Sequence, residues 1–255
     1  MKWFIFGKRE AALGIIAVLI VVLVSYLVPQ GVKAVVTQAE QRKLPIYSVQ
    51  TQDKNIAITF DAAWGNSDTD ELIRILKKHN AKATFFFTGQ WVSKYPDDVR
   101  KFYVAGHEMG NHSDSHFHIK GKTPEELRND ILACNEKIKN TVGKAPTVYR
   151  GPYGEYNNEL LSEVENLKMY AVQWDIDSRD WQKRSVTDMI SSVSGNAKNG
   201  SIILFHNDVK NTPTALDKIL EILTKEGYSF VTVSDLIYKD NYFLDSSGTQ
   251  HLQNE

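Results

Sequence analysis

The sequence predicts an α/β fold in which about seven parallel strands alternate with helices and form a closed or nearly closed barrel. From residue 54 onwards, apolar segments of strand length alternate with segments that have helical spacing. Residues 201–205 are apolar on both faces, which is typical of a parallel strand covered on both sides. A chain of 255 residues with 42% hydrophobic residues can bury one domain of this kind.

Each element follows from its local pattern. Residues 55–60 alternate and then become apolar, as in a buried strand, and residues 68–79 carry leucine and isoleucine at helical spacing. A helix should begin after Thr123, because Pro124 suits the first helical position and Glu126 completes a capping box. The remaining strands are expected at residues 82–87, 108–111, 147–150, 168–174, 201–206 and 229–233, with further helices at 97–105 and from Asn157, Ser185 and Thr212.

An apolar segment precedes the domain. Residues 11–28 are apolar or small except for Ser25 and Tyr26, and about 18 such residues nearly cross a hydrocarbon core of roughly 30 Å. The immediately flanking basic residues favour a cytoplasmic amino end. We expect a single-pass membrane anchor, an N-terminal transmembrane helix that leaves the folded domain outside the cytoplasm. The alternative is a cleaved signal peptide followed by secretion.

The expected organisation therefore has four parts. Residues 1–30 form a cytoplasmic stub and the anchor, residues 31–53 a stalk, residues 54–240 the folded domain, and residues 241–255 a polar tail.

Composition excludes some partners and cross-links. The formal net charge is -1 and no run of like charge occurs, so we expect no nucleic-acid partner. The single cysteine, Cys134, falls within a predicted helix, so the chain has neither an intrachain disulfide nor a cysteine-based zinc cluster. We expect its thiol to be a small buried apolar group.

Polar residues stand at or just after the ends of several predicted strands: Asp61, His112, Arg150, Asp177 and His206. In barrels of this kind the reactive residues gather at the carboxyl ends of the strands. The placement predicts a shared hydrolytic site.

The first candidates are a carboxylate and two histidines. Asp61 ends a buried strand, where a carboxylate is costly unless it is paired, and Ser67 or Asp68 is better placed to cap the next helix. His112 and His116 are four residues apart, which would put both imidazoles on one face of a helical turn within reach of one cation. The plain alternative for the two histidines is a solvated loop.

The other candidates supply a cation and an acid. Arg150 adjoins a tight turn at residues 151–154, whose backbone N–H groups could face an oxyanion. His206 follows an apolar strand, where a lone histidine is usually a core residue. Asp177 and Asp180 offer it a carboxylate, which would raise its pKa and favour the protonated acid.

Roughly residues 54 to 238 resemble the NodB-type polysaccharide deacetylases of carbohydrate esterase family 4. The resemblance rests on five segments in order: Thr59-Phe60-Asp61, His112-Ser113-Asp114-Ser115-His116, Arg150-Gly151-Pro152-Tyr153-Gly154, Asp177-Ser178-Arg179-Asp180-Trp181 and Leu204-Phe205-His206. It implies a distorted (β/α) barrel and metal-dependent hydrolysis of N- or O-linked acetyl groups on sugars, such as N-acetylglucosamine in chitin or peptidoglycan.

The resemblance implies a role for each side chain on the metal side of the site. Asp61 would be the general base that takes a proton from the attacking water, and Arg150 would orient it. His112 and His116 would be the ligands of a divalent metal, usually zinc or a similar ion.

The resemblance also implies roles for the residues that would contact the oxyanion, the leaving group and the acetyl methyl. The backbone N–H of Tyr153 would help to stabilise the tetrahedral oxyanion. His206, tuned by Asp180, would protonate the departing amine. Trp181 and Leu204 would form an apolar wall around the acetyl methyl.

One position departs from the family pattern. The first motif normally has two consecutive aspartates, the second a metal ligand, whereas Ala62 follows Asp61 here. With two neutral imidazoles and no second carboxylate, the metal should bind more weakly or borrow an oxygen from Asp61, Asn66, Asp68 or Asp114. The Phe-Asp-x-x-Trp-Gly variant and the amino-terminal anchor resemble the sporulation-associated, PdaB-like branch, which implies a spore or cell-wall peptidoglycan substrate.

Two other functions stay open from the sequence. One is a degenerate member that binds glycan or an envelope protein without hydrolysis, as the loss of a ligand at Ala62 suggests. The other is a glycosidase with paired carboxylates, Asp61 with Asp177 or Asp180.

Overall fold

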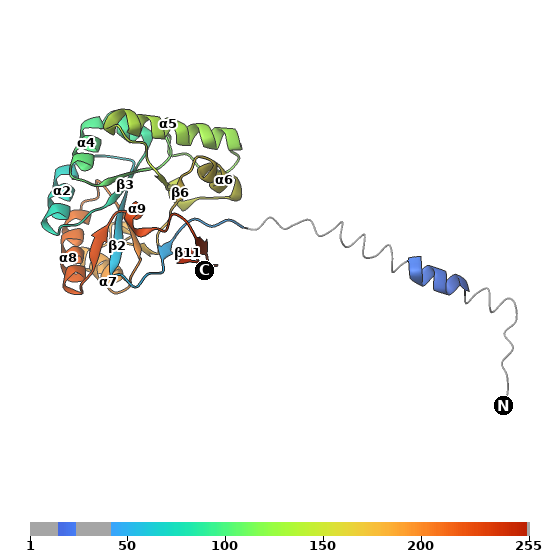
Figure 1. The fold of residues 1–255 in the computed structure, drawn as a ribbon. Coiled ribbons are helices and arrows are strands. Elements are labelled where there is room, and N and C mark those ends of the chain that lie inside the picture. The colour runs from blue at the N-terminus through green and yellow to red at the C-terminus, as the bar shows by residue number, and fades with distance from the viewer. Residues whose placement is uncertain (1–14, 24–41, 254–255) are drawn as a thin grey trace. The chain divides into compact units, whose positions relative to one another are not determined.

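The structure, a computed structural model, describes residues 15–23 and 42–253 (Figure 1). The chain divides into two units, Met1–Arg42 and Lys43–Glu255. Residues 15–23 are helical, and the rest of the expected anchor at residues 11–28 lies outside the described residues. Within the described residues, no helix has the length and apolar character needed to cross a membrane.

A parallel sheet of eight strands forms the framework of the second unit. Its order is β6-β5-β4-β3-β2-β8-β7, and β9 pairs with the start of β2. The strands are β2 (Asn55–Ala62), β3 (Thr84–Phe87), β4 (Glu108–Asn111), β5 (Val148–Tyr149), β6 (Tyr170–Ala171), β7 (Ile176–Asp177), β8 (Ile202–His206) and β9 (Ser229–Val231). The end strands β6 and β7 do not pair with each other in the part of the chain that is described, so the barrel is open.

All seven expected strands are present, which confirms the parallel α/β fold. The eighth strand, β7, was not predicted, because its two residues lie among polar residues and no apolar segment of strand length marks them in the sequence.

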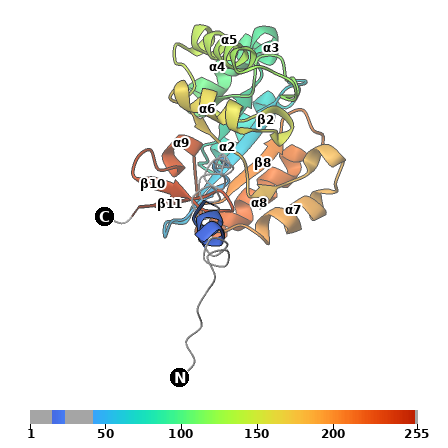
Figure 2. The ribbon, with the colours of Figure 1, turned by 90° about the vertical axis from the view of Figure 1, so that its right-hand side faces the viewer.

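Helices follow most strands and cover the outside of the sheet (Figures 1 and 2). They are α2 (Thr69–Lys78), α3 (Gly89–Lys94), α4 (Pro96–Val104), α5 (Pro124–Val142), α6 (Asn158–Asn166), α7 (Val186–Ser194), α8 (Thr212–Lys225) and α9 (Val233–Leu236), with 3-10 turns η1 (Pro152–Gly154) and η2 (Asp180–Gln182). The capping box of α5 is confirmed, since Thr123 and Glu126 each accept the other's backbone N–H. Cys134 of α5 is fully buried, as expected.

A second, three-stranded sheet has the order β1-β11-β10. Its strands are β1 (Ser48–Val49), β10 (Tyr242–Leu244) and β11 (Thr249–Leu252). Strand β1 lies in the range expected to be a stalk, and β10 and β11 lie in the range expected to be a polar tail. Each strand has only two to four residues, and β1 and β11 are far apart in the sequence, so no local pattern predicts their pairing. Figure 2 shows β10 and β11 near α9, and Gln250 exchanges hydrogen bonds with the backbone of Tyr238 just beyond that helix.

Strand β2 shows how the main sheet separates two faces. Ile56, Ile58 and Phe60 are buried in the apolar cluster shared with the helices. Ala57, which lies between Ile56 and Ile58, belongs to a different apolar cluster on the opposite, inner face of the sheet. Because side chains along a strand point to opposite faces in turn, Asp61 faces the interior.

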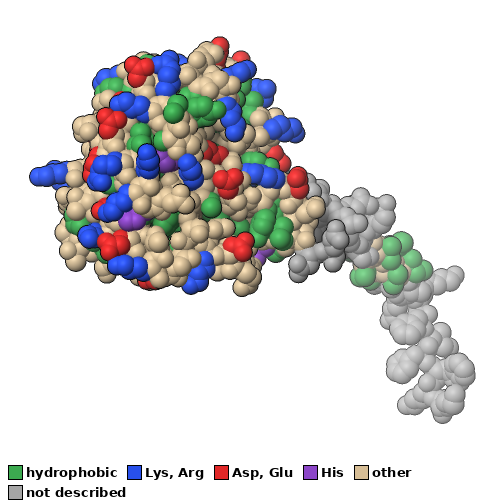
Figure 3. All heavy atoms as spheres, turned by 60° about the vertical axis from the view of Figure 1, so that its left-hand side comes forward, with side chains coloured by type: hydrophobic (Ala, Val, Ile, Leu, Met, Phe, Trp, Pro, Cys, Tyr) green, Lys and Arg blue, Asp and Glu red, His purple; other side chains and the backbone are tan. Residues whose placement is uncertain are grey.

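The surface carries no large field of one sign on the face shown in Figure 3. Lysine and arginine side chains alternate there with aspartate and glutamate. This matches the near-zero formal net charge of -1.

Candidate active site

The carboxyl-terminal ends of neighbouring strands bring four predicted residues together. Asp61 is in register with His206 on the adjacent strand β8. His112 directly follows β4, and its Nε2 lies 3.6 Å from Asp61 Oδ2. Arg150 directly follows β5, and its Nη1 donates to Asp61 Oδ1 at 2.9 Å.

The Arg150 guanidinium is completely buried, and its donors are shared among four acceptors. It binds Thr59 Oγ1 at 2.9 Å, Asp61 at 2.9 Å, and the carbonyl oxygens of Val172 at 3.4 Å and Gln173 at 3.0 Å. Burial lowers the pKa of Arg150, and the Asp61 carboxylate opposes that effect. The guanidinium therefore holds Asp61 in one orientation from the inside of the barrel.

Asp61 is ionised despite its burial. Burial alone would raise its pKa, but the charges of Arg150 and His206 and the hydrogen bond from Arg150 outweigh it and hold the pKa below the usual range. A carboxylate in this state accepts a proton, as a general base must.

His112 and His116 face each other with ring centroids 5.2 Å apart. The expected helical turn between them is wrong, because Ser113 and His116 both have left-handed backbone conformations with φ of 70° and 55°. His112 Nδ1 lies 2.8 Å from the carbonyl of Arg150, which fixes the proton on that nitrogen and leaves Nε2 with a free lone pair toward Asp61.

Both imidazoles are held in the neutral form. Burial lowers the pKa of His112, and burial with the neighbouring His112 lowers the pKa of His116 to about 4. Neutral imidazole is the form that binds a metal.

The donors next to the two histidines fit a divalent cation only in part. Two imidazole nitrogens and the Asp61 carboxylate are suitable ligands. However, no group of three His, Cys, Asp or Glu side chains has metal-binding geometry within residues 15–23 and 42–253. Ala62 offers no ligand and packs into the cluster on the helix side of the sheet. Asp114 is paired with Lys137 at 2.6 Å, whereas Asp61 Oδ2 lies 3.6 Å from His112 Nε2.

His206 is held by a buried carboxylate on the opposite side of Asp61. Its Nδ1 lies 2.8 Å from Asp180 Oδ1, and Asp180 Oδ2 accepts from the His206 N–H and from Thr212 Oγ1, both at 2.8 Å. Burial lowers the pKa of His206, but the hydrogen bond and charge of Asp180 outweigh it, so the pKa is raised. Asp177 instead accepts from the backbone N–H of Arg179.

The remaining predicted residues surround this centre. Tyr153 has a left-handed backbone with φ of 59°, and its exposed ring lies 4.6 Å from that of His116. Trp181 is exposed and donates its backbone N–H to Asp180 at 2.8 Å. Leu204 is buried on the same face of β8 as His206, because the two are separated by one residue. Their roles toward a substrate stay predictions.

One residue at the site, Trp64, was given no role in the sequence analysis. Trp64 is 55% exposed, and its ring lies 5.8 Å from that of His206 and 6.4 Å from that of His116. The signal in the sequence was a large aromatic residue three positions after Asp61, just beyond the end of β2.

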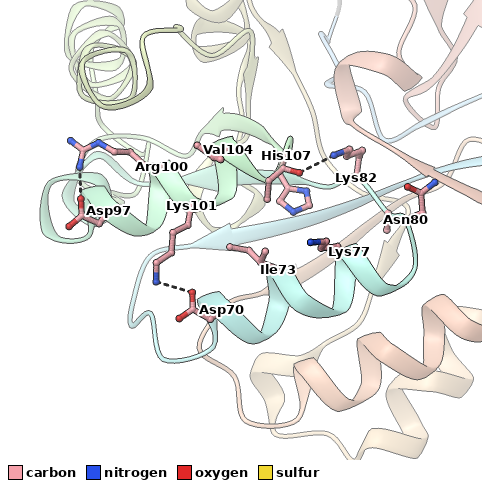
Figure 4. Close-up of a pocket in the computed structure, with 12 residues that line it drawn as sticks. Asp70, Ile73, Lys77, Asn80, Lys82, Asp97, Arg100, Lys101, Val104 and His107 are labelled. Carbon is pink, nitrogen blue, oxygen red and sulfur yellow. Dashed lines mark hydrogen bonds and ion pairs between the residues drawn. The ribbon is translucent and has the colours of Figure 1, made fainter.

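A groove of about 750 Å³ lies elsewhere, between α2 and α4 (Figure 4). It is lined by residues such as Ile73, Lys77, Lys101 and His107, and none of the predicted site residues takes part. This groove is therefore separate from the candidate active site.

The family follows from comparison with known proteins. The polysaccharide deacetylase family matches residues 48–172. A peptidoglycan-N-acetylglucosamine deacetylase of Bacillus cereus is 37% identical over 75% of this chain and 92% of its own length. The chain belongs to the polysaccharide deacetylase family, which confirms the resemblance drawn from the five motifs.

Two further relatives show how far the likeness extends. The peptidoglycan-N-acetylglucosamine deacetylase PgdA of Listeria monocytogenes is 34% identical over 76% of this chain, which spans about two fifths (41%) of that protein. Among solved structures, a pseudoenzyme of carbohydrate esterase family 4 from Bacillus anthracis is 28% identical, with a TM-score of 0.73 over 82% of this chain and 73% of that one.

Proposed function

We propose that this protein is a hydrolase that removes acetyl groups from N-acetylated cell-wall polysaccharide, with peptidoglycan N-acetyl sugars as the substrate. The observation that carries the proposal is a buried Asp61 held by Arg150, in register with a His206 whose Nδ1 lies 2.8 Å from the buried Asp180. These partners lower the pKa of Asp61 and raise that of His206. A base and an acid of this kind suit hydrolysis of an acetamide, whose amine is a poor leaving group. The peptidoglycan deacetylases among the relatives support the substrate class.

The side chains divide the reaction between them. Asp61 takes a proton from the attacking water, and Arg150 keeps this carboxylate ionised and oriented. His206 gives its proton to the departing nitrogen as the C–N bond breaks, which yields acetate and a free amine on the sugar. His112 and His116 would hold a divalent cation, which supplies Lewis-acid polarisation of the acetyl carbonyl.

Deacetylases of this family are generally metal dependent. We propose zinc as the ion in this chain and a weakened site, since Ala62 provides no carboxylate. Metal content of the purified protein should then be low unless zinc is supplied, and it should fall further in His112→Ala. Equal zinc retention by His112→Ala and the parent would contradict this assignment.

Acetate release from peptidoglycan and from N-acetylglucosamine oligomers tests the proposed function. We expect the full-length protein to release acetate when a divalent ion is supplied and to stop after addition of a chelator. Folded protein that releases no acetate with any of zinc, cobalt, manganese or nickel would contradict the proposal.

The second candidate function is a glycan-binding or protein-binding envelope module without hydrolysis. Ala62 favours it, as does the similarity to a Bacillus anthracis pseudoenzyme. Glycan binding by the parent without detectable acetate would establish this function. Of the two carboxylate pairs that a glycosidase could use, Asp61 with Asp180 is disfavoured, because both oxygens of Asp180 are already bound by His206 and Thr212. Shortened glycan chains with their acetyl groups retained would be its sign.

The pH dependence of deacetylation should report His206. Its raised pKa means that the acid form persists above the ordinary histidine range and that activity falls as the pH rises through this pKa. Asp180→Asn removes the charge that raises the pKa, so the alkaline limb of kcat/KM should move to lower pH. Thr212→Val removes one hydrogen bond to Asp180 without changing any charge and should leave the limb nearly in place. If the alkaline limb of kcat/KM stays in place in Asp180→Asn, a group other than His206 is responsible for that limb.

We also propose that residues 11–28 anchor the protein in the membrane with the folded domain outside the cytoplasm. The apolar sequence of this segment and the location of a cell-wall substrate support the proposal. Recovery of the full chain in the soluble fraction of lysed cells, or protection of the domain from external protease in protoplasts, would contradict it.

We further propose that the protein acts during sporulation. The Phe-Asp-x-x-Trp-Gly variant supports this role. Expression restricted to sporulating cells is the expected result, and equal expression during vegetative growth would contradict it.

A further inference from the structure

Trp64 is exposed where apolar packing would favour burial. More than half of its surface is open to solvent, at 55% exposure. A tryptophan side chain can bury a large apolar area, so leaving it in water forgoes a sizeable stabilisation. Packing of the domain therefore does not account for the position of this ring.

The loop that carries Trp64 is fixed by contacts on its buried side. The carbonyl of Gly65 accepts hydrogen bonds from Trp91 Nε1 at 2.9 Å and from Asn207 Nδ2 at 2.6 Å. Gly65 has no room for a side chain, because a Cβ there would collide with the Asp208 carboxylate. These contacts fix the backbone next to Trp64 and so keep the base of its side chain beside the site.

The same contacts tie Trp64 to the acid of the site. Asn207 directly follows His206, so the hydrogen bond from Asn207 to Gly65 joins the loop after β2 to the end of β8. The Trp64 ring lies 5.8 Å from the His206 ring. An aromatic side chain has only two rotatable bonds, so it binds a partner with little loss of conformational entropy.

The position of the ring relative to the reacting groups indicates what it contacts. An acetamido group that undergoes hydrolysis must lie between Asp61 and His206, and the sugar ring that bears it must lie just outside them. Trp64 borders this space, since its ring lies near those of both His206 and His116, with the His116 ring 6.4 Å away. The C–H face of a pyranose is an apolar surface that can stack on indole.

We propose that Trp64 is a substrate-binding residue whose indole stacks on the pyranose ring that carries the scissile acetamido group. It selects sugar-linked acetyl groups over small acetylated molecules. The proposal rests on the deacetylase function proposed above.

Binding of a tetramer of β-1,4-linked N-acetylglucosamine to the full chain tests the proposal without turnover, when all variants carry Asp61→Asn. Trp64→Ala should raise the dissociation constant at least tenfold, and Trp64→Phe should raise it less. The matched control is Tyr103→Ala, which removes an exposed aromatic ring on α4 and should leave binding unchanged. Equal affinity of Trp64→Ala and the parent would overturn the proposal.

A second measurement uses the unaltered tryptophan. The indole N–H resonance of Trp64, assigned by its absence in Trp64→Phe, should shift when the tetramer is added. An unshifted resonance at saturating tetramer would overturn the proposal even if Trp64→Ala fails to fold.

Kinetics of the active protein separate this proposal from the deacetylase function. Trp64→Ala should raise KM for the tetramer more than it lowers kcat and should lower kcat/KM for the tetramer by a larger factor than for a small acetyl ester. Protein that binds the tetramer through Trp64 but releases no acetate would refute the function and keep the subsite. Protein that deacetylates equally well with and without the indole would refute the subsite alone.

Discussion

Replacing Asp61 with asparagine should lower kcat for acetate release by about 100- to 10,000-fold, the range for loss of a general base. Asparagine has nearly the same shape and can still accept a hydrogen bond from Arg150, but it cannot take a proton from water. The structure keeps Asp61 in the ionised form that the reaction needs, since the charges of Arg150 and His206 hold its pKa down. Acetate release measured at saturating substrate tests the expectation.

Binding separates loss of chemistry from loss of fold in this variant. Asp61→Asn should bind N-acetylglucosamine oligomers with an affinity close to that of the parent. The matched control is Asp177→Asn, which removes another carboxylate at a strand end, and its rate should change only a few-fold because Asp177 bonds to the Arg179 backbone. A parental rate in Asp61→Asn would exclude Asp61 as the base.

Elements with a local signal were predictable from the sequence. Strand β2 is eight residues long and almost entirely buried, and α5 carries its start signal in Thr123 and Glu126. Strands β1 and β11 lie in the segments expected to be a stalk and a polar tail, and they pair with each other across about 200 residues. Their existence depends on tertiary pairing, which no short window of sequence contains.

The candidate site divides in the same way. Strand ends indicated which polar residues meet, because parallel strands present their carboxyl ends at one edge. The partners that fix those residues were hidden, since Arg150 is held by the backbone carbonyls of Val172 and Gln173, and any sequence supplies carbonyls. The left-handed backbone at His116 was equally hidden, because it is imposed by the surrounding loop rather than by the histidine.

Arg150→Met should lower the free energy of unfolding by about 3–5 kcal/mol at neutral pH, the typical cost of removing one partner of a buried ion pair. Methionine fills much of the space but leaves the Asp61 carboxylate buried without its cation. It also leaves the Thr59 hydroxyl and the carbonyls of Val172 and Gln173 without this donor. Urea unfolding of the two proteins measures the difference.

The pH dependence and a double-mutant cycle show whether the loss comes from the ion pair. In the parent, the depressed pKa of Asp61 contributes stability that is present above the unfolded pKa of about 3.9 and is lost as the pH falls through the folded pKa. Without Arg150, burial raises the folded pKa, so the deficit should shrink on acidification as Asp61 becomes neutral. Adding Asp61→Asn to Arg150→Met should then cost less than the two single changes together. The loss of stability in Arg150→Met could instead be the same at every pH, and the effects of the two substitutions could be additive. Lost packing would then explain the lower free energy of unfolding, and Arg150 would not be the residue that keeps Asp61 charged.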